Sequence, residues 1–184
     1  MITTTTTSTS TSTSRLGNNL LLNPGGRDGV LRPWVVGGNS NPRLDNGTFD
    51  PGYLPRTGLF QFAGGTGSFG TLTQTVAIVD ADRLITTSKI DGGYAAVNLS
   101  FWSRGAAYTT YDGAAVALYF LNDFNGTLSN ATSPEQAASS RWILYANSYP
   151  IPIGTRSIQY QMRFIRHDGA DIDSYIDDNI MTVY

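Results

Sequence analysis

From residue 16 onward, the chain is dominated by short stretches in which apolar and polar residues alternate with a period of two. The clearest runs from Ser157 to Arg166, where the apolar positions are Ile158, Tyr160, Met162 and Phe164 and the polar ones Gln159, Gln161 and Arg163. Successive side chains of a β-strand point to opposite faces, so this pattern predicts a strand with one buried face. Similar runs are Thr71–Val79, Ala95–Trp102, Ala114–Asn122, Arg141–Ser148 and Tyr175–Tyr184.

Turn signals separate these stretches. Asn122 to Gly126 predicts a hairpin turn, and residues 37–58 read as a long loop rich in Gly, Asn and Pro. No segment has a convincing helical period, and only Ser133–Ser140 is expected to form one short helical turn. The sequence therefore predicts an all-β fold, a two-sheet antiparallel sandwich or jelly roll over residues 16–184. The three tryptophans, Trp34, Trp102 and Trp142, are expected in its core.

Residues 1–15 form a separate segment, a Thr/Ser-rich arm without apolar periodicity. Such a segment cannot form a core, but threonine favours extended backbone. Because a polar arm gains little by lying on its own domain, we expect it to clamp a neighbouring subunit by adding a strand to a sheet edge. The alternative is that it docks on its own domain. The residues expected to make this subunit contact are Ile2, Thr3, Thr5, Thr7, Thr9, Thr11 and Thr13.

Composition excludes several classes of function. There is no cysteine, the only histidine is His167 and the only glutamate is Glu135, so no thiol chemistry and no histidine-rich metal or catalytic set is expected. A net charge of -2 argues against binding a nucleic-acid backbone. No apolar run is long enough to span a membrane, and the N-terminus does not resemble a secretory signal. We therefore expect a non-enzymatic protein.

Three motifs, in order, give the chain a resemblance to a family. The first motif is Asn19-Leu20-Leu21-Leu22-Asn23-Pro24-Gly25-Gly26-Arg27-Asp28-Gly29, followed by Trp34. It resembles the start of galactose-binding-like jelly rolls, which include carbohydrate-binding modules and the sugar-binding domain of F-box proteins. Leu72-Thr73-Gln74-Thr75-Val76 is similar to their Leu-x-Gln-x-Val strand, and Tyr175-Ile176-Asp177-Asp178-Asn179-Ile180 to their closing strand. The resemblance covers about residues 19–184 and implies a galactose-binding-like fold.

The same resemblance implies a structural calcium site that joins the first loop to the last strand. Its candidate ligands here are Asp28 and Asp178, because calcium prefers carboxylate and carbonyl oxygens. Where those modules have Phe-Glu, this chain has Arg27-Asp28. The alternative is that Asp28 caps a turn and Asp178 is solvated, in which case no cofactor is needed.

Sugar binding would require exposed aromatic rings beside polar side chains. The candidates are Tyr53, Tyr108, Tyr111 and Asp112, together with Phe69, all expected in loops at the ends of strands. The alternative is that these rings cover the core or a subunit interface, where tyrosine is enriched.

Two classes of function follow. The first is a structural or assembly protein, such as a capsid decoration protein or tail component of a tailed-phage virion, homo-oligomeric and bound to other subunits through its arm. The second is a lectin or carbohydrate-binding module that binds glycans through loop aromatics, located in the virion, outside the cell or in the cytoplasm.

Overall fold

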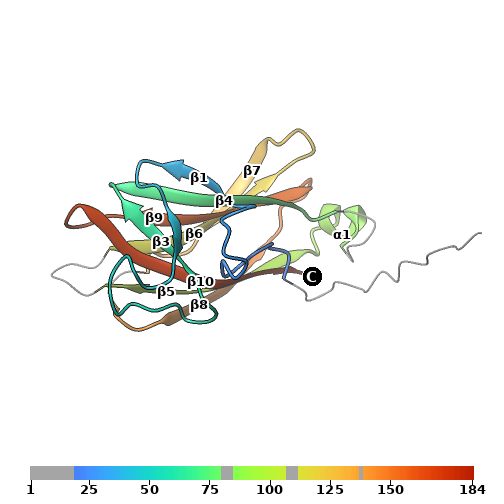
Figure 1. The fold of residues 1–184 in the computed structure, drawn as a ribbon. Helices are drawn as coiled ribbons and strands as arrows, with labels where there is room; N and C mark the ends of the chain where they lie inside the picture. Colours follow the sequence, from blue (N-terminus) through green and yellow to red (C-terminus); the bar gives the residue numbers. More distant parts are fainter. Residues whose placement is uncertain (1–18, 80–84, 107–111, 137–138) are drawn as a thin grey trace, which may run out of the picture.

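In the computed structural model, two five-stranded antiparallel sheets pack face to face (Figure 1). The structure describes residues 19–79, 85–106, 112–136 and 139–184. The first sheet has the order β1-β4-β9-β6-β7 and the second β2-β3-β10-β5-β8. This confirms the predicted all-β, jelly-roll sandwich.

The strands of the first sheet are β1 (Val35–Gly38), β4 (Phe69–Ala77), β9 (Ser157–Ile165), β6 (Gly113–Leu121) and β7 (Thr127–Thr132). Those of the second are β2 (Arg43–Asp45), β3 (Gln61–Thr66), β10 (Asp171–Val183), β5 (Ala96–Gly105) and β8 (Ile143–Pro150). One short helix, α1 (Thr87–Asp91), lies near the end of β4 in the view of Figure 1.

The core lies between the sheets and is built by the apolar halves of the alternating strands. Ile158, Tyr160, Met162 and Phe164 of β9 all have exposed fractions of 0%. Trp34 joins this core and packs edge-on against Phe62 and Tyr160. The alternation observed in the sequence therefore sets which face of each sheet is buried.

Three local expectations were wrong, whereas the hairpin turn predicted at Asn122–Gly126 is confirmed, because it joins β6 to the antiparallel β7. The expected loop 37–58 contains β2. A helix forms at α1, where the Thr86 hydroxyl accepts a hydrogen bond from the Lys89 N–H, whereas the described residues of Ser133–Ser140 form none. Trp102 and Trp142 are only partly buried and lie outside the main core. Arg56 stacks on the Trp102 ring, and Arg104 on the ring of Trp142, which packs against a small second cluster around Tyr175.

Candidate functional site

The outer face of the first sheet carries a row of long polar side chains along its central strand. Gln159, Gln161 and Arg163 of β9 point away from the core, since they alternate with the buried residues of that strand. In the sequence these positions are recognisable only as the polar half of an alternating strand. The strand pairing shows what surrounds them.

Small side chains flank most of this polar row. On β4, Thr71, Thr73 and Thr75 lie opposite Arg163, Gln161 and Gln159. On β6, Ala115 and Ala117 lie opposite Arg163 and Gln161, whereas the large Tyr119 lies opposite Gln159. Arg163 and Gln161 therefore lie between short neighbours, and Gln159 has a short neighbour on the β4 side only.

A groove of about 760 Å³ runs from this surface to the edge of the sheet. One wall is polar and includes Thr71, Thr73, Thr75, Gln159 and Gln161; the other is apolar and includes Leu22, Pro33, Val35 and Val36. None of the residues that line the groove carries a charge. Pockets that combine aliphatic surface with a few amide and hydroxyl groups are typical of small-molecule sites.

Two features fix the shape of the groove. The Gln74 amide exchanges two hydrogen bonds with the backbone of Leu22, at 2.8 and 3.0 Å, and so holds the segment before β1 against β4. β1 pairs only with Gly70 to Thr73, so within the described chain no strand lies against the outer edge of Gln74 to Ala77. The groove therefore includes an open strand edge.

Arg163 lies at the border of the groove, next to Thr71. Its guanidinium stacks over the Phe69 ring, 5.5 Å from the ring centroid. Its Nε is buried and has no hydrogen-bond partner within the described ranges. Packing, rather than a polar partner, holds this cation in place.

The predicted sugar-binding residues lie elsewhere. Tyr53 stacks on Tyr175 on the outer side of the second sheet, with the Arg104 guanidinium 5.1 Å from its ring centroid. Asp112 is 3% exposed and accepts hydrogen bonds from the backbone N–H groups of His167, Asp168 and Asp173. Both hold loops in place, so their geometry favours the structural alternative. Tyr108 and Tyr111 lie outside the described residues, as does the whole arm, residues 1–15.

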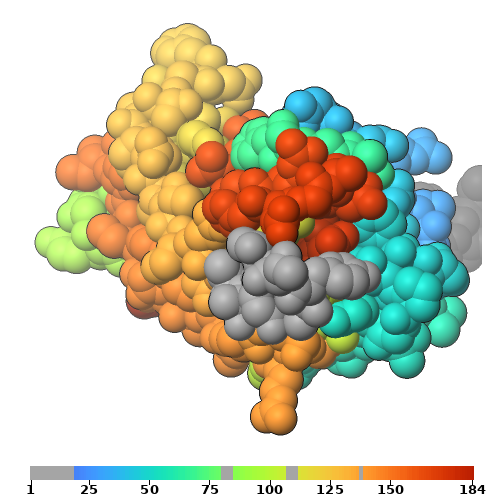
Figure 2. Space-filling model, turned by 90° about the vertical axis from the view of Figure 1, so that its left-hand side faces the viewer, coloured from blue at the N-terminus to red at the C-terminus, as the bar shows by residue number. Residues whose placement is uncertain are grey.

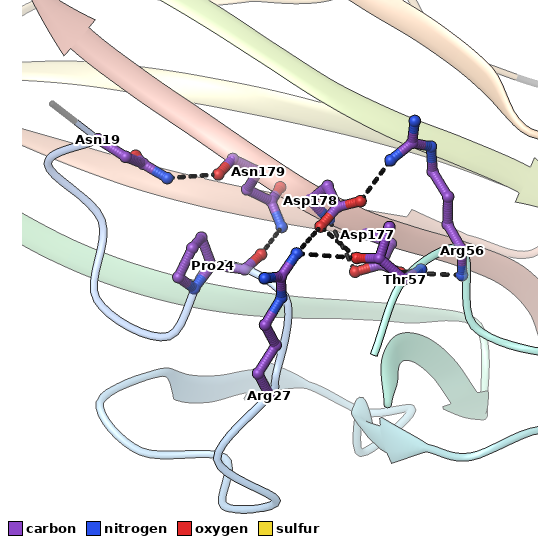
Figure 3. A network of polar contacts seen from close by, with 8 residues as sticks. All are labelled: Asn19, Pro24, Arg27, Arg56, Thr57, Asp177, Asp178 and Asn179. Carbon is purple, nitrogen blue, oxygen red and sulfur yellow. Dashed lines mark hydrogen bonds and ion pairs between the residues drawn. The ribbon is translucent and has the colours of Figure 1, made fainter. Parts of the chain in front are cut away.

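The predicted calcium position is instead a junction of arginines and carboxylates (Figure 3). Asp178 accepts hydrogen bonds from Arg27 Nη2 at 3.1 Å, Arg56 Nη1 at 2.5 Å and the Thr57 hydroxyl at 2.7 Å. The neighbouring Asp177 accepts the backbone N–H groups of Arg56 and Thr57. First loop and last strand are joined as the resemblance implies, but by ion pairs.

These residues do not fit a calcium ion. Two guanidinium groups already bind the Asp178 carboxylate and would repel a divalent cation, which needs six to eight oxygen ligands. Asp28 makes only a long, 3.5 Å backbone contact with Asn23. Within the described ranges, no group of three or more His, Asp or Glu side chains could hold a metal. The metal prediction for Asp28 and Asp178 is therefore not supported by the geometry.

The two carboxylates of this junction differ in acidity. Burial raises the pKa of Asp177 to about 6, and the neighbouring charge of Asp178 adds to the effect. The pKa of Asp178 is lowered although burial opposes it, because Thr57, Arg56 and Arg27 donate hydrogen bonds to its ionised form.

A second acidic cluster lies at the end of the sandwich, where the turn between β9 and β10 meets the segment before β3 (Figure 2). Burial raises the pKa of Asp173 to about 7, with additional effects from Asp50, Asp112 and Asp171. The Tyr175 hydroxyl donates a short hydrogen bond to Asp50. These groups bind one another, and nothing in their contacts points to a ligand.

Comparisons with known proteins identify the fold. No protein-family model matches the chain, and no curated protein sequence resembles it significantly. A family 61 carbohydrate-binding module solved with β-1,4-galactotriose has a TM-score of 0.58 at 18% identity, over 91% of this chain and 98% of that one. The xylan-binding CBM22-1 domain of Paenibacillus barcinonensis Xyn10C has a TM-score of 0.58 at 11% identity, over 93% and 97%.

A third similar structure comes from a virus. The enzymatically active domain of tailspike protein 4 of bacteriophage CBA120 has a TM-score of 0.63 at 13% identity. The match covers 90% of this chain but only 21% of the tailspike chain. Together these likenesses show that the chain has the galactose-binding-like jelly-roll fold of carbohydrate-binding modules. No helix in the described part of the chain is both long and apolar enough to cross a bilayer.

Proposed function

We propose that this protein is a non-catalytic glycan-binding module, and that its binding surface is the groove on the outer face of the first sheet. One observation carries the proposal: the groove joins a row of amide and hydroxyl side chains to an aliphatic wall. A sugar presents hydroxyl groups at its ring edge and C–H groups on its faces, so it matches such a surface. Gln159 and Gln161 each offer both a donor and an acceptor to adjacent hydroxyls.

The hydrogen bonds that Gln161 makes within the protein leave its side chain available to bind a ligand. Gln161 Nε2 donates to the Thr73 hydroxyl and its Oε1 accepts from the Tyr119 hydroxyl, both at 3.4 Å, which is long for a hydrogen bond. Exchanging such contacts for shorter ones to a ligand costs little. Similarity to a module whose solved structure includes bound galactotriose supports the same class of function.

Isothermal titration against galactan, xylan and bacterial surface polysaccharides tests the proposal. Gln159→Ala and Gln161→Ala should each weaken binding about 3- to 10-fold, since a neutral hydrogen bond contributes about 0.5–1.5 kcal/mol. Asn98→Ala is the matched control, because Asn98 is a polar, outward-facing residue on β5 of the opposite sheet. Equal losses in all three variants, or no binding of any glycan by the wild type, would reject the groove as a glycan site.

Binding through loop aromatics remains a separate prediction. Tyr108→Ala and Tyr111→Ala in the same titration distinguish it from the groove. Loss of binding in these variants, with Gln159→Ala and Gln161→Ala unchanged, would place the sugar at the loops.

A second candidate is a virion assembly role in which the arm of one subunit clamps another. The open edge of Gln74 to Ala77 favours it, because an extended Thr/Ser segment can add a strand to an unpaired edge. Similarity to a domain of a phage tailspike supports a location in the virion. Deleting residues 2–14 should leave the domain folded and abolish self-association or incorporation, measured by light scattering and by virion assembly. Normal incorporation of the shortened chain would rule the arm out.

A further inference from the structure

We infer that the glycan bound in this groove carries carboxylate groups, and that Arg163 binds them. The inference rests on the proposed function and adds the chemical class of the ligand. It starts from the charge distribution on the outer face of the first sheet.

Among the described residues, Arg163 has no counterion. No ion pair or hydrogen bond joins its guanidinium to another residue in the described part of the chain, whereas Arg27, Arg56 and Arg156 all pair with aspartates. A half-buried charge loses part of its hydration, and an anionic ligand would compensate for that loss.

The position of Arg163 suits a ligand that lies in the groove. Arg163 follows Gln161 by two residues on β9, so both point to the same side of the sheet. It lies opposite Thr71, which lines the groove. A saccharide that contacts Gln159 and Gln161 and extends along β9 therefore reaches the guanidinium.

The surroundings keep this end of the row open and rigid. A Cβ on Gly37 would lie 2.6 Å from Thr71 Oγ1, so only glycine leaves the Thr71 side of the row uncovered. Stacking on Phe69 fixes the plane of the guanidinium, which reduces the entropy lost when it binds a ligand. Arginine presents its N–H groups in a fork that matches both oxygens of a carboxylate.

The lining of the groove does not oppose an anion. It contains no aspartate or glutamate, so a carboxylate would meet only amides, hydroxyls and aliphatic surface before it reaches Arg163. On this face Glu135 lies over Gly113 of β6, two residues from the partner of Arg163, but its carboxylate is already paired with His167. The acidic clusters of the protein lie at the loop end of the sandwich and at the junction with the last strand. This separation favours an acidic over a neutral saccharide.

The test compares polygalacturonate with its methyl ester, which keeps the sugar backbone and removes the charge, and with neutral galactan. Wild-type protein should bind polygalacturonate at least about 10-fold more tightly than the ester at low salt, where a charge pair is least screened. Arg163→Gln should abolish this preference and keep binding of the ester. Arg163→Lys should retain only part of it, because lysine lacks the planar fork.

Arg43→Gln is the matched control, since Arg43 also stacks on a phenylalanine, Phe49, but belongs to the other sheet. Equal binding of acid and ester by the wild type would overturn the inference and leave the proposed function standing. The inference would also be overturned if Arg163→Gln and Arg43→Gln lost the same amount of affinity for polygalacturonate. Binding of dextran sulfate as tight as that of polygalacturonate would overturn it too, because both results indicate general electrostatic attraction. Failure to bind any saccharide would overturn both proposals.

Discussion

Replacing Asp178 by asparagine tests whether ion pairs, rather than a metal, join the first loop to the last strand. Asp178 has a positive φ of 47°, a conformation that asparagine tolerates, so the substitution removes the charge without backbone strain. The side chain keeps its shape and one oxygen for the Thr57 hydroxyl. Any change in stability then reports the charge.

The size of the effect follows from the exposure of each partner. The side chains of Asp178 and Arg56 are 15% and 31% exposed, so their pair should contribute about 1 kcal/mol, whereas Arg27 is 62% exposed and adds at most a few tenths. Weakening the Thr57 hydrogen bond from charged to neutral costs about 1 kcal/mol more. Relief of the repulsion with Asp177 offsets part of this. The net loss should be about 1–2 kcal/mol, or about 2–8 °C in melting temperature for a chain of this length.

Thermal unfolding followed by circular dichroism measures this loss. The pKa of Asp178 is lower in the folded than in the unfolded state, so its stabilisation is present above about pH 4 and is lost as the pH falls further. The difference between wild type and Asp178→Asn should therefore shrink on acidification, and Asp28→Asn, which removes no ion pair, should match the wild type. Stabilisation of the wild type by calcium, or a full-sized difference at low pH, would refute the ion-pair explanation.

Three further predictions concern stability. The pKa values of Asp173 and Asp177 are raised to about 7 and about 6, so above about pH 4 the folded state binds more protons than the unfolded state. The free energy of unfolding should therefore fall as the pH rises toward 7. Urea titrations at several pH values should show this fall, and Asp173→Asn should make the free energy of unfolding depend less on pH. Tyr160→Phe removes a 2.7 Å hydrogen bond to Asn179 between two fully buried side chains and should cost about 1–2 kcal/mol in the same assay; an unchanged midpoint would contradict it. Gly38→Ala should lower the free energy of unfolding by about 2 kcal/mol or more, because φ is 82° and the new Cβ would lie 2.3 Å from the Phe69 carbonyl oxygen. Wild-type stability in this variant would contradict the prediction and show that β1 and β4 can separate there.

The sequence predicts those parts of the fold that depend on neighbouring residues. Alternation in β4 and β9 identifies the buried face of each strand correctly, because the side-chain period is local. β2 and β7 escape the same reasoning, since Arg43–Asp45 is short and Thr127–Thr132 lies at an exposed edge where neither face needs apolar residues.

The candidate site depends on contacts that no local pattern contains. Gln161 and Thr73 are 88 residues apart in the chain, and Arg27 and Asp178 are 151 apart. Sequence reasoning placed Asp178 at the junction through a resemblance, but it had no means of finding that Arg56 and Arg27 meet it there. Phe69, expected as a sugar-stacking ring, instead supports a cation beside the groove.

The central position of β10 constrains how the protein is made. This strand lies between β3 and β5, so the second sheet cannot assemble before residues 171–183 have left the ribosome. Until then β5 and β3 each lack a neighbour, and the apolar faces of both sheets stay uncovered. The sandwich can therefore be completed only after nearly the whole domain has been synthesised.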